Sequence, residues 1–112
     1  MEIQFRNSKM MKEFNSSKTL LQKYGKRRAD VIQQRLVELR AAEVLEDIRN
    51  LTRPRCHELT QNRKGQLAVN LDHPYRLIFK PLNEPIPLND DGGLDWSSIT
   101  SIQILEVVDY HE

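Results

Sequence analysis

The sequence predicts an α+β fold in which helices pack on one face of a mainly antiparallel β-sheet. Two observations lead to this prediction. After a first short strand, apolar residues recur with a helical period in the first half of the chain and alternate with polar residues in the second half. In addition, a chain of 112 residues can bury one hydrophobic core but not two, so we expect a single domain over residues 1–112.

The N-terminal segment predicts a strand and two short helices. Residues 1–6 alternate between polar and apolar side chains, which is typical of a half-buried strand. Asn7 is of a type preferred at helix N-termini and predicts a short helix that ends at Phe14. Ser16 predicts the start of a second helix for the same reason, and Gly25 ends it.

The strongest periodic pattern predicts a long helix from about Lys26 to Ala42. Its apolar residues form one stripe at steps of three, four and five residues, namely Ala29, Ile32, Leu36, Leu39 and Val44. A short helical turn is expected over residues 43–49. Pro54 then ends the helical pattern, because a proline disfavours helix at the residue before it.

The C-terminal half predicts three strands. Residues 67–71 and 75–80 alternate around a turn with the sequence DHP, which indicates a β-hairpin. Residues 99–108 are apolar on both faces, as expected for a central strand. Between the hairpin and the last strand lies a long acidic loop, residues 82–98, which Trp96 is expected to anchor.

Positive and negative side chains are unequally distributed along the chain. Residues 1–80 contain 17 Lys and Arg residues against nine acidic residues, whereas residues 81–112 contain seven acidic residues and no Lys or Arg. The net charge of +1 therefore conceals a basic segment, which can attract phosphate groups, and an acidic segment. Folding can also bring the two segments together so that their charges neutralise each other.

The composition excludes several classes of protein. Cys56 is the only cysteine, so an internal disulfide and a metal site of several thiolates are both impossible. The sequence has no run of about 18 apolar residues, and its first residues lack the apolar core of a signal peptide. We therefore expect a cytoplasmic protein that does not interact with a membrane.

Five polar residues are candidates for a catalytic site. Asp109, Tyr110 and His111 directly follow the last apolar strand, where alternation directs the first and third to one side and the second to the other. Arg76 lies inside a hairpin strand, and His57 precedes the first of these strands. Brought together, such groups can accept the proton of a ribose 2′-OH, protonate the leaving 5′ oxygen and stabilise charge on the phosphate. These residue types therefore suit phosphodiester cleavage.

Each of these residues also has an ordinary structural explanation. A polar C-terminus is usually a frayed end, a loop histidine is usually a surface residue, and a strand arginine usually pairs with an acid. His73 is expected only to form the DHP turn. The histidine spacing does not follow a zinc-binding pattern, and the DDGG segment lacks the ligands of a calcium loop, so we expect no metal and no cofactor. The residues alone predict an α+β domain that is compatible with nucleic-acid binding.

Several segments resemble the HigB branch of the RelE/ParE superfamily of toxin–antitoxin proteins. They are the N-terminal FRN, the helical KRRADVIQQRLVELRAAEVLEDIRN, the central CHELTQNRKGQLAVNLDHPYRLIF and the C-terminal LEVVDYH. The resemblance covers most of the chain and implies a RelE-like fold. It also implies a toxin that cleaves mRNA by 2′-OH attack without a metal, usually in the A site of the translating ribosome. A further implication is a neighbouring helix-turn-helix antitoxin of the HigA type, which binds and silences the toxin.

The resemblance also implies roles for individual residues. The catalytic positions of the family fall on His57, Arg76, Asp109, Tyr110 and His111. The sequence does not decide which group is the general base and which the general acid; our preference is Asp109 or His57 as the base and His111 as the acid. Contacts with RNA phosphates are expected from Lys26, Arg27, Arg28, Arg63 and Lys64. These five basic residues can equally be solvated residues at a helix start and a turn.

Two other functions stay open at this point. ParE-like members of the same superfamily inhibit DNA gyrase by protein–protein contact and need no acid–base histidines. A catalytically inactive member would only bind its antitoxin and help to repress a promoter. Induction of the DNA damage response would distinguish gyrase inhibition from mRNA cleavage, and the inactive member would not arrest growth at all.

Overall fold

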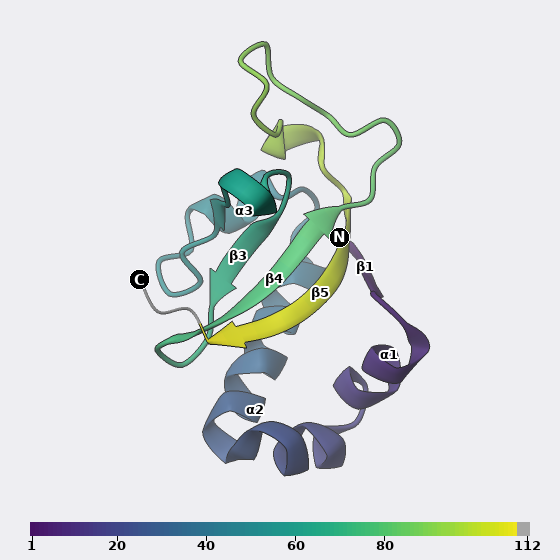
Figure 1. The fold of residues 1–112 in the computed structure, drawn as a ribbon, viewed down its shortest axis with the longest axis vertical. Helices are drawn as coiled ribbons and strands as arrows, with labels where there is room; N and C mark the ends of the chain where they lie inside the picture. The colour runs from purple at the N-terminus through teal and green to yellow at the C-terminus, as the bar shows by residue number, and fades with distance from the viewer. Residues whose placement is uncertain (110–112) are drawn as a thin grey trace.

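The chain folds around one five-stranded mixed sheet, which we describe from a computed structural model for residues 1–109 (Figure 1). The strand order is β1-β5-β4-β3-β2. The strands are β1 (Glu2–Phe5), β2 (His57–Glu58), β3 (Leu67–Asn70), β4 (Tyr75–Pro81) and β5 (Ser101–Asp109). β1 runs parallel to β5, and the other neighbours are antiparallel. The predicted α+β fold with a mainly antiparallel sheet is therefore confirmed.

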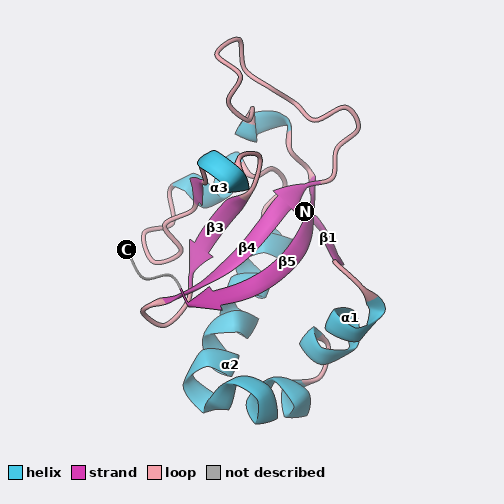
Figure 2. Ribbon diagram, viewed as in Figure 1, coloured by secondary structure: helices cyan, strands magenta, loops and turns pink. Residues whose placement is uncertain are grey.

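The helices begin and end close to the predicted positions (Figure 2). They are α1 (Ser8–Phe14), α2 (Ser17–Ala41) and α3 (Glu46–Arg49), with the 3-10 turns η1 (Gln61–Arg63) and η2 (Trp96–Ser98). The side chain of Asn7 accepts a hydrogen bond from the backbone N–H of Met10, and Ser16 accepts one from Thr19, so both predicted caps form. Gly25 interrupts α2 with a φ of 80°, a conformation that glycine adopts without steric cost.

The main hydrophobic core lies between α2 and one face of the sheet, which we call the helix face. In the view of Figure 1, α2 passes behind the strands. The predicted apolar stripe supplies Ile32, Leu36 and Leu39, each at most 2% exposed. They pack in one cluster with residues that project from the helix face, including Leu77, Phe79, Ile102 and Ile104. The stripe packs against the helix face because this contact removes the apolar surfaces of both α2 and the sheet from water.

A buried arginine attaches α2 to the edge of the sheet. The Nε of Arg35 donates to the backbone carbonyl of Asn70, at the end of β3, over 2.6 Å. Its Nη1 donates to Glu38 over 3.0 Å, which keeps the buried charge paired. This contact fixes the end of β3, next to which the candidate functional residues lie.

The long acidic loop is held by its predicted anchor. The indole Nε1 of Trp96 donates to Glu58 over 3.1 Å, and the backbone N–H of Leu94 donates to the other carboxylate oxygen over 3.1 Å. The guanidinium of Arg49 stacks over the Trp96 ring at 3.9 Å from its centroid. The loop is therefore attached to β2 and α3 at its C-terminal end.

Candidate functional site

The strand register places His57 and Arg76 on the sheet face opposite α2, which we call the site face. His57 pairs with Ala68, and Ala68 pairs with Ile78 of β4, so these side chains share one face. Arg76 lies two residues before Ile78 on the same strand and points the same way. The site face has its own small apolar cluster of Leu59, Ala68 and Ile78.

The two predicted catalytic side chains meet on this face. The Nη1 of Arg76 lies 3.4 Å from the Nε2 of His57, although 19 residues of chain separate them. The other imidazole nitrogen, Nδ1, lies 2.9 Å from the backbone carbonyl of Arg55. Because a carbonyl can only accept, Nδ1 carries the proton and the Nε2 of a neutral His57 is an acceptor. The geometry therefore presents the lone pair of His57 beside a guanidinium.

A pocket of about 200 Å³ opens beside this pair. Its lining residues are Arg55, Asn70, Leu71, His73, Pro74, Tyr75 and Arg76. None of these described residues is acidic, so the pocket suits an anion. His73 lies in the turn between β3 and β4, as predicted, and it also contributes to the pocket. No sequence motif points to Arg55, since only the fold brings its loop beside β4.

The predicted C-terminal residues are only partly described. Asp109 ends β5 and pairs with Tyr75, so strand alternation directs its side chain to the helix face, whereas Arg76 projects from the site face. Tyr110 and His111 lie outside the described residues. The sheet therefore brings His57 and Arg76 together on the site face, and it directs the side chain of Asp109 to the opposite face.

Arg63 contacts a carboxylate that projects from the site face. Its Nη1 lies 3.1 Å from the Oε1 of Gln66 and 3.4 Å from a carboxylate oxygen of Glu106. Glu106 pairs with Ile78 and so projects from the site face, which makes it a carboxylate that the analysis of the sequence missed. Lys64 follows η1 and is exposed. Of the two predicted RNA-binding residues of this segment, Arg63 thus reaches the site face, whereas Lys64 lines a pocket between η1 and the acidic loop.

The other predicted RNA-binding residues lie elsewhere. Arg28 makes a two-pronged ion pair with Asp72, with N–O distances of 3.1 and 3.3 Å, and stacks over the ring of Tyr75 at 3.3 Å from its centroid. These contacts attach α2 to the hairpin on the helix face. Lys26 pairs with Asp30 over 2.8 Å, and both are exposed. Arg27 is also exposed. The basic start of this helical segment is therefore not on the face that carries His57.

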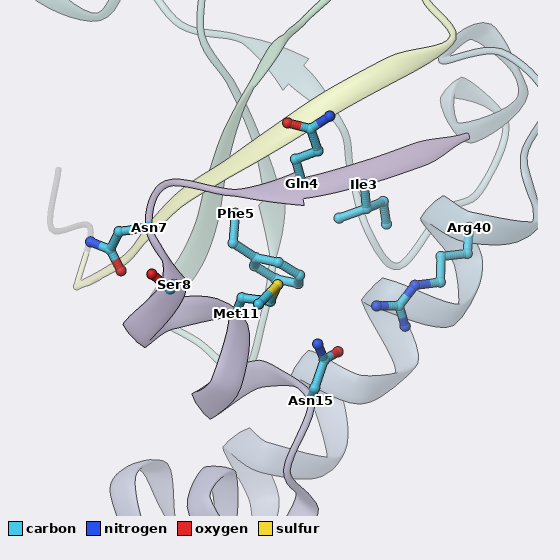
Figure 3. A pocket seen from close by; sticks show the side chains of 8 residues that line it. All are labelled: Ile3, Gln4, Phe5, Asn7, Ser8, Met11, Asn15 and Arg40. Carbon is cyan, nitrogen blue, oxygen red and sulfur yellow. The ribbon is translucent and has the colours of Figure 1, made fainter.

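Two of the larger pockets are lined by neither His57 nor Arg76. One of about 480 Å³ lies between β1, α1 and the end of α2, with Ile3, Phe5 and Met11 among its lining residues (Figure 3). The other, of about 760 Å³, lies between η1 and the acidic loop and includes Ile86 and Leu88 in its lining. The pocket of about 200 Å³ lined by Arg55 and Arg76, which we call the arginine pocket, is the one of these three that contains Arg76.

Cys56 precedes the candidate histidine but is not activated. Burial is the main cause that raises the pKa of its thiol to about 12, and Glu58 adds to the effect, while Arg49 opposes it. The thiolate form is therefore scarce at neutral pH, and Cys56 is unsuited to be a nucleophile.

Residues 1–109 contain neither a candidate metal cluster nor a candidate membrane-spanning helix. No group of three or more His, Cys, Asp or Glu side chains is placed to hold a metal ion in this part of the chain. None of the helices described for these residues has both the length and the apolar character that crossing a membrane requires.

Comparison with known proteins identifies no relative. No protein-family model matches the sequence, and no curated protein is significantly similar to it. What the fold and the site define is thus a class: an α+β domain with an imidazole–guanidinium pair on one sheet face and, next to the arginine of that pair, a pocket without acidic residues in its described lining. The case for a particular function rests on this geometry and on the motifs of the sequence.

Proposed function

We propose that the protein is the toxin of a type II toxin–antitoxin system and acts as a ribosome-dependent mRNA endonuclease of the HigB type. The observation that carries this proposal is the 3.4 Å contact between His57 Nε2 and Arg76 Nη1 on the site face. An imidazole that can accept a proton at Nε2, next to a guanidinium, is a pair suited to phosphodiester cleavage.

The proposed reaction begins with proton transfer to His57. Its Nε2 accepts the proton of the ribose 2′-OH, and the 2′ oxygen forms a bond to phosphorus. Arg76 stabilises the negative charge that develops on the phosphoryl oxygens. The bond from phosphorus to the 5′ oxygen breaks as an acid protonates that oxygen, a role that we assign to His111. The products are a 2′,3′-cyclic phosphate and a 5′-hydroxyl.

The same proposal includes partners and a compartment. A HigA-type antitoxin would silence the toxin, and the A site of the ribosome would present the mRNA in the cytoplasm. The resemblance in the sequence supports both partners. The basic segment over residues 1–80 also suits a protein that approaches ribosomal RNA and message, because their phosphates attract Lys and Arg.

Primer extension on a reporter mRNA after brief induction in bacterial cells tests the proposal. The wild-type protein is expected to break the message inside the translated frame. His57→Ala should reduce cleavage by roughly 10²- to 10⁴-fold, the usual contribution of one acid–base group. Arg53→Ala removes an exposed arginine outside the pair and serves as the control that keeps activity.

Two results would contradict the proposal. An intact message in cells that stop growing and induce the DNA damage response would favour a gyrase-inhibiting toxin. Normal growth together with tight antitoxin binding would favour an inactive co-repressor.

A further inference from the structure

We infer that Arg55 and Arg76 form a binding subsite for a backbone phosphate of RNA, in the pocket beside His57. This inference rests on the proposed function and adds to it a residue that no motif identified. Arg55 lies in the loop before β2, and it lines the same pocket of about 200 Å³ as Arg76. Two guanidiniums in a pocket without acidic lining residues favour a doubly coordinated anion over a neutral ligand.

The backbone of Arg55 supports a role beyond surface charge. Its φ is 44°, in the left-handed region that residues with a side chain rarely adopt. In this conformation the carbonyl of Arg55 reaches His57 Nδ1 at 2.9 Å, and the same residue lines the pocket. Glycine would adopt this conformation with less steric cost, yet the chain has arginine at this position.

Two acids on neighbouring elements are already paired with other arginines. The nearest acid in the hairpin turn, Asp72, is already paired with Arg28 on the helix face. Glu106, on the site face, is in contact with Arg63. A phosphate can therefore enter between Arg55 and Arg76 without displacing a carboxylate from either of those two ion pairs. The subsite lies beside the imidazole and would hold the RNA backbone while His57 takes the 2′-OH proton.

The substitution Arg55→Gly tests the contribution of the side chain separately from that of the backbone. Glycine retains the carbonyl that holds His57 and relieves the strained φ, but it removes the guanidinium. We expect the melting temperature to stay the same or rise, while RNA binding weakens. A structural role for Arg55 would predict the opposite change in melting temperature, so the two measurements together identify a binding residue.

The chain offers a matched control. Gln61 is the other described non-glycine residue with a positive φ, at 57°, and it lies outside the arginine pocket. Gln61→Gly should likewise keep or raise the melting temperature but leave RNA binding unchanged. Arg55→Lys keeps the charge without the planar fork and should bind RNA with intermediate affinity.

The binding measurement uses the full-length protein and a fluorescent single-stranded RNA that is 2′-O-methylated throughout, so that it is not cleaved. Anisotropy is recorded over a series of salt concentrations. For Arg55→Gly, we expect the slope of log affinity against log salt to be smaller by about 0.7, the value for one lost phosphate contact in a single strand. Message cleavage in cells is measured in parallel for the same variants.

Each outcome decides between the two proposals. If Arg55→Gly binds RNA with the wild-type slope while His57→Ala abolishes cleavage, the subsite is wrong and the proposed function stands. If the wild-type protein cleaves no message and shows no salt-dependent binding, both are wrong. A smaller slope for Arg55→Gly with an unchanged slope for Gln61→Gly supports the subsite.

Discussion

At the scale of single residues, the candidate site depends on how His57 is held. The carbonyl of Arg55 fixes the proton on Nδ1 and leaves Nε2 toward Arg76. Cys56, one position earlier, is a titratable side chain in a different environment, where burial keeps the neutral form. Cys56 and His57 are thus neighbours in different surroundings, because Cys56 packs against the core and His57 projects from the site face.

The raised pKa of Cys56 predicts slow alkylation. At pH 8 the folded protein should react with iodoacetamide far more slowly than the protein in urea, because only the thiolate reacts. The shift also sets a direction for stability. The unfolded thiol loses its proton above its ordinary value of 9.0 and the folded one only near 12, so the free energy of unfolding should fall as pH rises through this window.

The Cys56 prediction has a direct control. Cys56→Ser removes the titrating thiol, so its free energy of unfolding should lose less between pH 9 and 11 than that of the wild type. Alkylation of the folded wild type at the rate of the urea-unfolded protein would contradict the buried, neutral thiol.

At the scale of elements, the acidic loop is a structured segment with one main attachment. Two hydrogen bonds to Glu58 and the stacking of Arg49 on Trp96 hold its C-terminal end. At the N-terminal end of the loop, the side chain of Asn83 donates to Thr100 over 3.0 Å. The length of the loop therefore does not imply free movement, because both of its ends are fixed.

Glu58→Ala is expected to release the loop. Hydrogen bonds to a charged group contribute about 1.5–3 kcal/mol each, so the free energy of unfolding should fall by an amount of about that size. Amide exchange in residues 86–96 should accelerate, because Leu94 and Trp96 lose their acceptor. Hydrogen exchange with mass spectrometry measures this change.

Glu84→Ala is the matched control, since it removes an exposed acid from the same loop. It should leave amide exchange and the free energy of unfolding nearly unchanged. Equal effects of the two substitutions would mean that the charge of the loop, and not the attachment at Glu58, determines its order.

At the scale of the whole molecule, the two faces of the sheet have different tasks. The helix face is covered by α2 and contains most of the buried apolar side chains. The site face has only a small cluster and bears the polar pair. Stability is therefore expected to depend mainly on one face, and the proposed activity on the other.

Two substitutions in β5 compare the faces. Ile104 is fully buried against the helices, and Ile104→Ala should lower the free energy of unfolding by about 2–5 kcal/mol. Val108 is half-buried on the site face, so Val108→Ala should cost clearly less. Urea unfolding measures both, and equal losses would contradict this division between the faces.

Local patterns in the sequence were enough to predict most of the secondary structure, although not the two-residue strand β2. The caps at Asn7 and Ser16, the break at Gly25 and the hairpin around the DHP turn all form where they were expected. Each depends on interactions within a few residues, so a short stretch of sequence contains all the information needed. The anchor at Trp96 was also expected, although its partner Glu58 lies 38 residues away and was not.

By itself, the sequence determined the helices and the longer strands, the α+β class and the residue types suited to phosphodiester cleavage. Only the tertiary structure decided which of these residues meet. Strand pairing joined His57 to Arg76, brought Arg55 to their pocket and set Asp109 opposite Tyr75. The physical reason is register: a shift of one residue moves a side chain to the other face of a sheet, and burial of the whole core selects the register.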